Sequence, residues 1–293
     1  MPKLSIIIPS YNSKAITDQC LMSLLKNLRS EDAFDYEIIV VDNASTDGSQ
    51  EMIKKYEPRF KSLKLIRNRK NVGYSKANNQ ALSIVKGDYV LFLNSDVMID
   101  SVNFKRLLYY FDSRPEIGAC TVRVNLSDGS IDLASHRGFP TIWNSCAYFL
   151  KLERLFGIVP YINRIFGGYH MVWNDFQTIH EIDSPSGAFY LSRKKILDEV
   201  KGFDEDFFMY GEDLDLSWRI KELGYAILYY PLFHVIHLKY ASGLGTQDAK
   251  VQEEIKKHFY EAMKIFYKKH YEKRHSAITN KIIYGLIDLK AKL

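Results

Sequence analysis

The feature that most constrains this chain is the regular alternation, over its first hundred residues, of short apolar runs with longer amphipathic segments. Residues 6–8 and 38–41 are apolar at every position instead of at every second one, which is typical of strands covered on both faces in a parallel sheet. The expected strands are residues 4–9, 36–42, 63–67 and 88–93, and the expected helices between them are residues 15–28, 49–56 and 74–85. This series predicts an α/β fold with an open, mainly parallel, Rossmann-like sheet flanked by helices.

Composition narrows the class of protein. The 293 residues are 46% hydrophobic and 26% charged, an ordinary globular composition that argues against collagen, coiled coils and wholesale disorder. The net charge of +5 comes from 40 basic and 35 acidic residues spread along the chain, which does not indicate a nucleic-acid partner. Cys20, Cys120 and Cys146 form no C-x-x-C pair, so we expect neither a disulfide framework nor a thiolate metal site. No export signal and no spanning segment are found, which predicts a cytoplasmic protein.

Polar residues follow each expected strand of this region. They are residues 9–12 (PSYN), 42–47 (DNASTD), 67–71 (RNRKN) and 94–96 (NSD). Ligands of open α/β sheets bind beyond the carboxyl ends of the strands, so these four segments form the expected site. Capping of the next helix is the structural alternative for any single segment. A dinucleotide-binding oxidoreductase fits poorly, because its first turn needs G-x-G-x-x-G where this chain has PSYN.

Six strings of residues stand in order along the chain: SIIIPSYN (5–12), IVVDNASTD (39–47), NVGYSKAN (71–78), LNSD (93–96), SGAF (186–189) and GFDEDFFMYGEDLDLSWR (202–219). Together they resemble the family-two inverting glycosyltransferases of GT-A fold, and within them the rhamnosyltransferase-like branch. The resemblance extends from residue 4 to about residue 243, and the order and spacing of the motifs make it specific. It implies an enzyme that transfers a sugar from a nucleotide-sugar donor.

The resemblance places the donor site at the strand ends. The donor-binding residues it implies are Pro9, Tyr11, Asn12, Asp42, Asn71, Asn94 and Asp96. From their chemistry, Asp42 can accept the imide N–H of uracil or thymine, and Tyr11 offers a ring beside the base. Asp42 is also a good turn former before Asn, Ala and Ser, so a purely structural role is its alternative.

A divalent cation, Mg²⁺ or Mn²⁺, is the implied cofactor. Asp96 corresponds to the last acid of the family's Asp-x-Asp motif, whereas Asn94 departs from that motif at its first position. One carboxylate provides too few ligands for such a cation, so the diphosphate, water and other residues must contribute the rest. His237, which opens the segment HLKYAS (237–242), is the implied second ligand. The alternatives are that Asp96 caps a helix and that His234, expected to be buried and structural, is the ligand instead.

The general base is expected in the acidic string that opens a helix after Gly211. First-turn acids are stabilised by the helix dipole, and Asp215 can pair with Arg219 one turn on, so the string has a structural explanation as well. The family places its base in this acidic pair, which implies Asp213 as the base, with Glu212 as its substitute and Asp215 as structural. Inverting transfer needs one carboxylate to deprotonate the acceptor hydroxyl, and residues 186–188 would approach the donor sugar.

The resemblance further implies three parts and a substrate class. Residues 1–100 would be the nucleotide-sugar-binding half, residues 101–245 the acceptor-binding and catalytic half with an insertion at about 141–182, and residues 246–293 a helical tail. The favoured donor is dTDP-rhamnose, with UDP-linked hexoses, N-acetylhexosamines or galactofuranose as alternatives. A lipid-linked or polysaccharide acceptor in bacterial surface-glycan synthesis is expected. A non-catalytic sugar-binding module is the competing function.

Two segments outside the motifs suggest contact with a membrane surface. The insertion between residues 143 and 176 is rich in aromatic and basic side chains. The tail carries an apolar set at helical spacing with lysines between its members: Phe259, Tyr260, Met263, Phe266 and Tyr267, with Lys256, Lys257, Lys264, Lys268 and Lys269. Such a mixture suits a membrane interface. The alternative is that the apolar stripe packs on the core and the lysines are solvated.

Overall fold

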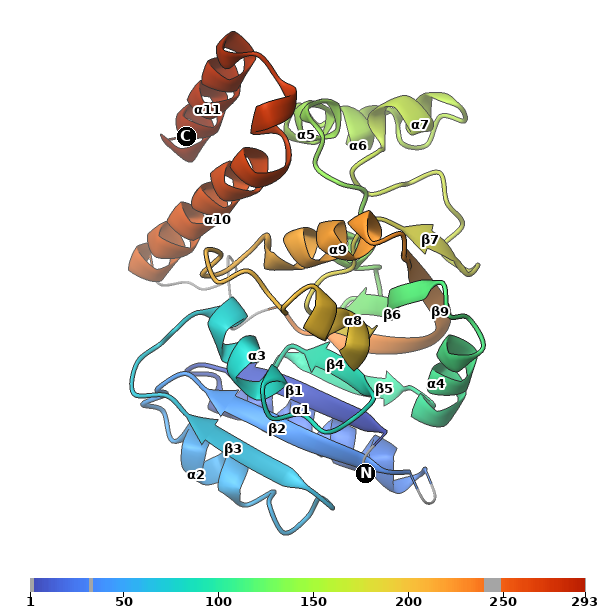
Figure 1. Cartoon of the computed structure of the whole chain (residues 1–293), viewed down its shortest axis with the longest axis vertical. Coiled ribbons are helices and arrows are strands. Elements are labelled where there is room, and N and C mark those ends of the chain that lie inside the picture. The colour runs from blue at the N-terminus through green and yellow to red at the C-terminus, as the bar shows by residue number, and fades with distance from the viewer. Residues whose placement is uncertain (1–2, 32–33, 240–248, 293) are drawn as a thin grey trace.

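The computed structural model describes residues 3–31, 34–239 and 249–292, and within them nine strands form one sheet (Figure 1). The strands are β1 (Leu4–Ser10), β2 (Tyr36–Asp42), β3 (Leu63–Arg67), β4 (Tyr89–Leu93), β5 (Val97–Ser101), β6 (Ile117–Leu126), β7 (His180–Ile182), β8 (Phe189–Arg193) and β9 (Ala226–His237). Their order is β3-β2-β1-β4-β8-β6-β9-β5, and β7 pairs with β9. Strands β3, β2, β1 and β4 run parallel, whereas β8 is antiparallel to both neighbours.

Helices cover both faces of this sheet and extend beyond one end of it. They are α1 (Lys14–Arg29), α2 (Ser49–Lys54), α3 (Tyr74–Leu82), α4 (Phe104–Asp112), α5 (Ile142–Phe149), α6 (Leu152–Phe156), α7 (Ile162–Phe166), α8 (Lys194–Glu199), α9 (Glu212–Glu222), α10 (Ala249–His270) and α11 (Ala277–Lys292). The predicted α/β class with a flanked open sheet is confirmed, and β2 and β3 match their predicted bounds residue for residue.

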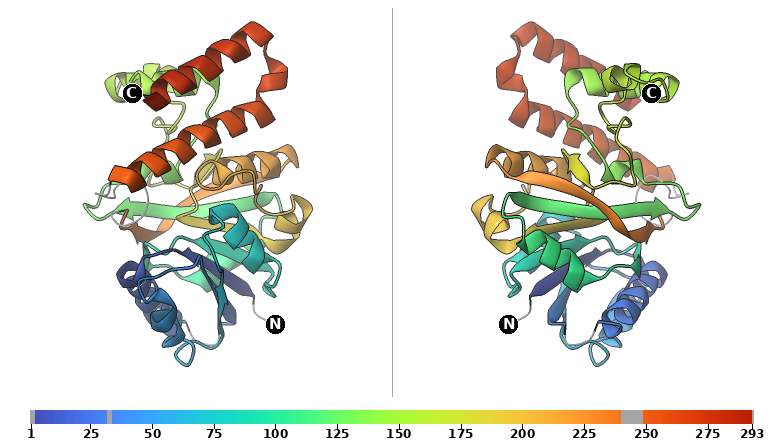
Figure 2. Two further views of the ribbon diagram at one scale, coloured as in Figure 1. Left: turned by 90° about the vertical axis from the view of Figure 1, so that its left-hand side faces the viewer. Right: turned by 90° about the vertical axis from the view of Figure 1, so that its right-hand side faces the viewer.

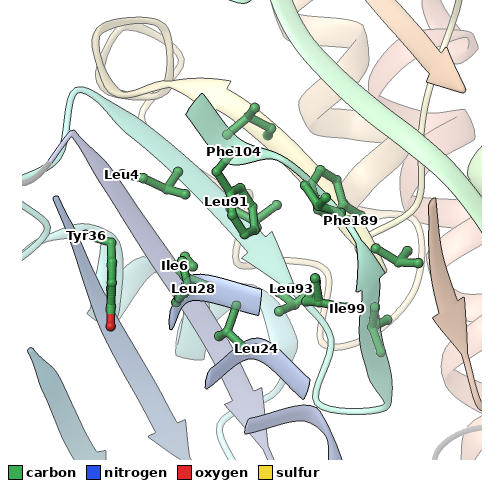
Figure 3. Packing of buried hydrophobic residues seen from close by; sticks show 14 of the residues in the cluster. Leu4, Ile6, Leu24, Leu28, Tyr36, Leu91, Leu93, Ile99, Phe104 and Phe189 are labelled. Carbon is green, nitrogen blue, oxygen red and sulfur yellow. The ribbon is translucent and has the colours of Figure 1, made fainter. Parts of the chain in front are cut away.

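The uniformly apolar strands are buried on both faces, as their sequence predicts. Ile6 and Ile8 of β1 pack with Leu24 and Leu28 of α1 on one face, and Figure 3 shows Leu24 and Leu28 lying toward Ile6. Ile7, on the opposite side of the same strand, packs in a second cluster with residues of α3, α8 and α9. Because successive side chains of a strand alternate between faces, a strand covered on both sides needs an apolar residue at every position.

The insertion and the tail lie together at the end of the molecule farthest from β1, β2 and β3 (Figures 1 and 2). The insertion folds into α5, α6 and α7, and the tail into the antiparallel pair α10 and α11. A third apolar cluster, which includes Leu214 of α9 and Phe266 of α10, fixes the tail to the rest of the protein. One sheet runs through the first two predicted parts of the chain, so their boundary near residue 100 stays a prediction. Among the described helices, none has the length and apolarity to cross a bilayer.

Candidate active site

The ends of β1 and β2 bring the first two polar segments together. Ser10 and Asp42 are register partners at the carboxyl ends of these parallel strands. Asp42 is fully buried, and its Oδ2 accepts hydrogen bonds from the Ser45 N–H at 3.0 Å and from Gln50 Nε2 at 2.6 Å. Its Oδ1 is shielded from solvent, and none of the described residues donates to it. An unmatched buried acceptor of this kind suits an incoming N–H donor.

The other donor-side candidates divide into exposed and structural positions. Tyr11 is exposed directly after β1, whereas Pro9 lies within the strand, opposite Val41. Asn12 Oδ1 accepts from the Thr46 N–H at 2.8 Å and thereby joins the loops that follow β1 and β2. Asn71 Oδ1 accepts from the Gly73 N–H at 3.0 Å within its own turn. The side chains of Asn12 and Asn71 therefore shape the loops, and a direct donor contact for either stays a prediction.

Asn94 lies where β4 meets the segment before β8. Its backbone N–H donates to the Ala188 carbonyl at 3.4 Å, and its buried Oδ1 has no donor among the described residues. The neighbouring Gly187 is held closely, since a Cβ there would lie 2.4 Å from the Tyr74 hydroxyl. That hydroxyl donates to the Gly187 carbonyl at 3.3 Å. The backbone at Gly187 thus passes through a space that admits no side chain.

Asp96 and His237 meet at the far side of this edge, although 141 positions separate their numbers in the sequence. His237, at the end of β9, places its Nε2 3.2 Å from Asp96 Oδ1. Its Nδ1 lies 2.8 Å from Oδ2 of the buried Asp132, whose Oδ1 accepts from Lys239 Nζ at 2.6 Å. Because the residue after Asp96 begins β5, Asp96 caps no helix. The remainder of the predicted His segment, residues 240–242, lies outside the described residues.

The charges of this cluster compensate one another. Burial alone would lower the pKa of His237, but its hydrogen bonds to Asp132 and Asp96 and their negative charges raise that pKa to about 9. Burial would raise the pKa of Asp132, yet hydrogen bonds with His237 and Lys239 lower it to about 2. Asp132 therefore orients the imidazole through Nδ1, which leaves Nε2 directed at Asp96. A carboxylate behind a histidine is the usual support of a metal-binding imidazole.

The pair Asp96 and His237 fits one side of a divalent cation shell. A carboxylate oxygen and an imidazole nitrogen 3.2 Å apart can bind the same ion, with phosphate oxygens and water as the other ligands. Such binding would displace the proton that His237 holds between the two acids. In the part of the chain that the structure describes, no group of three or more His, Cys, Asp or Glu side chains is arranged around a common metal position.

The acidic string opens α9 as predicted, and its first two acids are both buried. Asp213 Oδ2 accepts from Arg137 Nη2 at 2.7 Å and from the Gly187 N–H at 3.3 Å. Arg137 is itself buried and also donates to the Pro185 carbonyl at 2.7 Å. The guanidinium and the backbone N–H together hold the Asp213 carboxylate beside the backbone of residues 186–188.

Glu212 has a different environment from its neighbour. Its Oε2 is buried without a donor among the described residues. Burial and the adjacent charge of Asp213 raise the pKa of Glu212 to about 8. Burial and the charges of Glu212, Asp213 and, more weakly, Asp96 raise the pKa of Tyr74 as well, so the acids of both halves of the site surround this one phenol. At neutral pH Glu212 is therefore mostly protonated, whereas Asp213 lies against a permanent cation.

Two further expectations have clear outcomes. Asp215 pairs with Arg219 at 2.7 Å, as predicted, and it also lies 2.8 Å from Nε2 of His270 in α10. The prediction that His234 is buried is wrong: its side chain is 41% exposed and is 2.6 Å from Asp100 Oδ2. The reason is the bend in β9, where the register with β6 shifts between Tyr230 and His234 and turns this ring outward.

Sequence reasoning missed Asp132, Arg137 and Tyr74. Asp132 and Arg137 flank a short 3-10 turn, Leu133–Ser135, that follows β6. Neither belongs to a recognisable motif, and their partners His237 and Asp213 lie 105 and 76 residues away. Tyr74 stands inside the quoted string NVGYSKAN, where its ring reads as an ordinary helix-face residue. Only the fold reveals that these three side chains complete the site.

The sequence of this chain is similar to those of known proteins. The family model described as "Glycosyl transferase family 2" matches residues 5–175, more than half of the chain. The chain belongs to this family. Among curated relatives it is 29% identical to rhamnosyltransferase WbbL of Escherichia coli over 79% of the chain and 82% of WbbL. It is 26% identical to an N-acetylglucosaminyl-diphospho-decaprenol L-rhamnosyltransferase of Mycobacterium tuberculosis over 69% of the chain and 66% of that enzyme. The predicted family and enzyme class are confirmed.

Solved structures show the same fold. The mannosyltransferase PcManGT from Pyrobaculum calidifontis, solved with GDP-Man and Mn²⁺, aligns with a TM-score of 0.58 at 16% identity over 92% of this chain and 64% of its own. Residues 1–349 of Staphylococcus aureus TarS, solved with UDP-GlcNAc, align with a TM-score of 0.58 at 20% identity over 97% of this chain and 71% of that one. The predicted GT-A fold is thereby confirmed. The chain spans between 17% and 82% of the length of the first curated relatives it matches.

Proposed function

We propose that this family-two glycosyltransferase transfers a sugar, with inversion, from a nucleoside-diphosphate sugar to a lipid-linked or polysaccharide acceptor in bacterial surface-glycan synthesis. dTDP-rhamnose is the favoured donor, because two relatives that align over most of the chain are named rhamnosyltransferases. UDP-linked hexoses, N-acetylhexosamines and galactofuranose are the alternative donors. The enzyme would act in the cytoplasm, at the inner face of the cell membrane.

One observation carries the donor-binding part of this proposal. Three side-chain oxygens near the carboxyl edge of the sheet, Asp42 Oδ1, Asn94 Oδ1 and Glu212 Oε2, are buried without a donor among the described residues. Each unmatched acceptor costs about 1–3 kcal/mol. A folded protein that keeps three of them near one edge of its sheet is prepared for a ligand rich in N–H and O–H donors. A nucleotide sugar offers an imide N–H at one end and sugar hydroxyls at the other.

The chain's own residues then supply the acid–base chemistry. Asp213 would accept the proton of the acceptor hydroxyl as this oxygen attacks the anomeric carbon from the face opposite the leaving diphosphate. Arg137 and the Gly187 N–H fix the carboxylate in one orientation. Glu212 is the substitute base if it loses its proton. A positioned base is typically worth ~10²- to 10⁴-fold in rate. Direct displacement leaves no covalent intermediate on the enzyme.

A divalent cation, Mg²⁺ or Mn²⁺, would be held by Asp96 and His237. When bound, it supplies Lewis-acid stabilisation to the departing diphosphate. Asp132 would keep the His237 ring in its binding orientation through the 2.8 Å contact at Nδ1.

The test is release of nucleoside diphosphate from a panel of nucleotide sugars mixed with lipid-linked and polysaccharide acceptors. dTDP-rhamnose should give the fastest release, and Asp213→Asn should lower transfer at least ~10²-fold while nucleotide affinity stays nearly constant. The exposed Asp128→Asn is the matched control and should keep full activity. A variant Asp213→Asn that retains more than about a tenth of the activity would move the base to Glu212. No release from any donor would favour the non-catalytic sugar-binding module.

The insertion and α11 support membrane contact better than α10 does. Phe266 and Tyr267 of α10 are buried in the third apolar cluster, so two of the five apolar residues of the predicted stripe serve core packing. Large apolar side chains are instead exposed on the insertion, led by Ile158 at 90% and Tyr161 at 86%. Exposed bases accompany the apolar residues of the insertion and α11: Lys151, Arg154, Arg164, Lys281, Lys290 and Lys292. Each base near an anionic leaflet contributes about 1 kcal/mol.

Vesicle flotation tests this contact. The protein should float with anionic vesicles at low salt and be released at high salt, because the Debye length falls as salt rises. Ile158→Glu with Tyr161→Glu should weaken flotation. Tyr109→Glu, which changes an equally large, 78% exposed side chain on α4, is the control and should not. A protein that remains unbound under all salt conditions would assign these segments to contacts with other proteins.

A further inference from the structure

An apolar cavity of about 460 Å³ lies between the insertion, the start of α9 and the two tail helices. Its volume falls within the ~300–1,000 Å³ typical of ligand sites. Ile142 and Phe149 of α5, Met263 of α10 and Ile287 of α11 are among its walls. Figure 1 shows these helices on the same side of the sheet, with α11 outermost.

The charged residues of the lining belong mostly to the candidate active site. Arg137, Glu212 and Asp213 line the cavity where α9 begins, and Lys290 of α11 is the remaining charged residue of the lining. Because α9 packs on the sheet and α11 is the outermost helix, the polar and apolar parts of the cavity lie at different depths. A molecule that reached the base from this side would place a hydroxyl at Asp213 and its remainder against hydrocarbon.

The cavity also opens to the surface that carries the exposed apolar residues. Leu150, Leu286 and Leu289 line the cavity and are each more than half exposed. Its apolar lining is therefore continuous with the apolar, basic end of the molecule formed by the insertion and α11. Among the described residues, Lys290 is the one charged residue of the lining on that side, so a hydrocarbon chain that enters there meets mainly apolar side chains on its way toward Asp213.

From this continuity we infer that the cavity binds the hydrocarbon chain of the acceptor, an isoprenoid or acyl chain carried on a phosphate. The inference rests on the proposed transfer to a lipid-linked acceptor and deepens it, since it makes the tail helices a wall of the acceptor site. Burial of each methylene group strengthens binding by up to about fourfold. Affinity should therefore depend on chain length and on the shape of the cavity, with no bilayer present.

The experiment is a calorimetric titration of the full chain with isopentenyl, geranyl and farnesyl monophosphate. EDTA is present and vesicles and donor are absent, so that neither a metal-bridged phosphate nor a bilayer contributes. Affinity should rise at least about tenfold from the five-carbon to the fifteen-carbon chain. Met263→Trp, which fills the cavity, and Leu286→Glu, which charges its wall, should each weaken farnesyl monophosphate binding about tenfold or more.

The matched control is Ile282→Glu on the same helix, because Ile282 is 57% exposed, similar to Leu286 at 51%, but does not line the cavity. It should leave farnesyl monophosphate binding within about twofold. If Met263→Trp fails to bind nucleotide and is therefore misfolded, the comparison of Leu286→Glu with Ile282→Glu decides. Equal affinity for all three chains, or equal effects of these two glutamates, would overturn the inference. Loss of sugar transfer with every donor, while the chain-length dependence persists, would overturn the proposed function instead.

Discussion

The buried ion pair of Arg137 and Asp213 allows the sharpest test of how the site is held together. The two side chains are 10% and 9% exposed, and Nη2 and Oδ2 are 2.7 Å apart. Arg137→Met removes the cation and leaves Asp213 as an uncompensated buried charge. Breaking such a pair from one side typically destabilises a protein by about 3–5 kcal/mol. The Pro185 carbonyl, which also accepts from Arg137, still accepts from the Ser184 hydroxyl in this variant. The loss of stability therefore comes from the Asp213 carboxylate.

A double-mutant cycle isolates this effect. Arg137→Met alone should lower the free energy of unfolding by about 3–5 kcal/mol, roughly 5–8 °C in melting temperature for a chain of this size. Asp213→Asn alone should also destabilise, because it strands the guanidinium. The double variant should lose less than the sum of the two, with a coupling energy of about 1–3 kcal/mol.

The assay is urea unfolding followed by circular dichroism, with Lys257→Met as the control. Lys257 and Glu261 are 69% and 50% exposed and 3.9 Å apart, so losing that pair should change stability by less than about 0.5 kcal/mol. Single-variant losses that add to within about 0.5 kcal/mol in the double variant would refute the view that Arg137 exists to balance Asp213. A loss from Lys257→Met as large as that from Arg137→Met would refute the argument from burial.

Three further predictions follow from the contacts of the site. Because the pKa of Glu212 is raised from 4.5 to about 8, the folded state loses stability as pH rises through this window. Glu212→Gln should remove about 1–3 kcal/mol of that loss between pH 5 and pH 8, as measured by urea unfolding. A variant with the same dependence of stability on pH as the unchanged protein would contradict the shift. Asp96→Ala and His237→Ala should each weaken Mn²⁺-supported nucleotide binding about tenfold or more in calorimetry, whereas full turnover in excess EDTA would return both residues to structural roles. Gly187→Ala should cost about 1–3 kcal/mol, because its Cβ would lie 2.4 Å from the Tyr74 hydroxyl, and Tyr74→Phe in the same chain should recover part of the lost melting temperature.

The position of the candidate donor-binding residues at the strand ends was predictable, because these residues are tied to local patterns. Asp42 ends β2 and Asn94 directly follows β4, and the parallel order of those strands brings their ends to one edge. A series of parallel strands therefore places both residues at the same edge of the sheet. The same reasoning predicted the helix that presents Glu212 and Asp213, since an acidic first turn after a glycine is a strong local signal.

The partners of those residues could not be predicted, because long-range pairing determines them. Asp132 and Arg137 follow β6, whose neighbours β8 and β9 come much later in the chain. Their positions depend on β8, which lies antiparallel between β4 and β6 in the sheet. No local periodicity of the sequence predicts that arrangement. The prediction that His234 is buried was wrong for a related reason. An apolar run predicts a buried strand, but the shift of register in β9 decides which of its side chains face outward.

The tail is the element whose role the structure changes most. The mixture of lysines and aromatic residues in its sequence suits a membrane interface, yet α10 is joined to α9 by polar and apolar contacts. His270 lies 2.8 Å from Asp215 of α9, and Phe266 packs against Trp218 with ring centroids 6.0 Å apart. Lys269 adds ion pairs to Asp204 and Asp206 in the loop before α9.

These contacts fix α10 on α9, the helix that carries Glu212 and Asp213. A movement of α11 would therefore be transmitted through α10 to the wall of the apolar cavity and to the first turn of α9. The residues proposed for the acceptor side come from the middle and the last third of the chain, whereas most of those proposed for the donor side come from the first third. Sequence motifs are dense on the donor side and sparse on the acceptor side, which is the distribution expected if one nucleotide-binding edge serves many acceptors within the family.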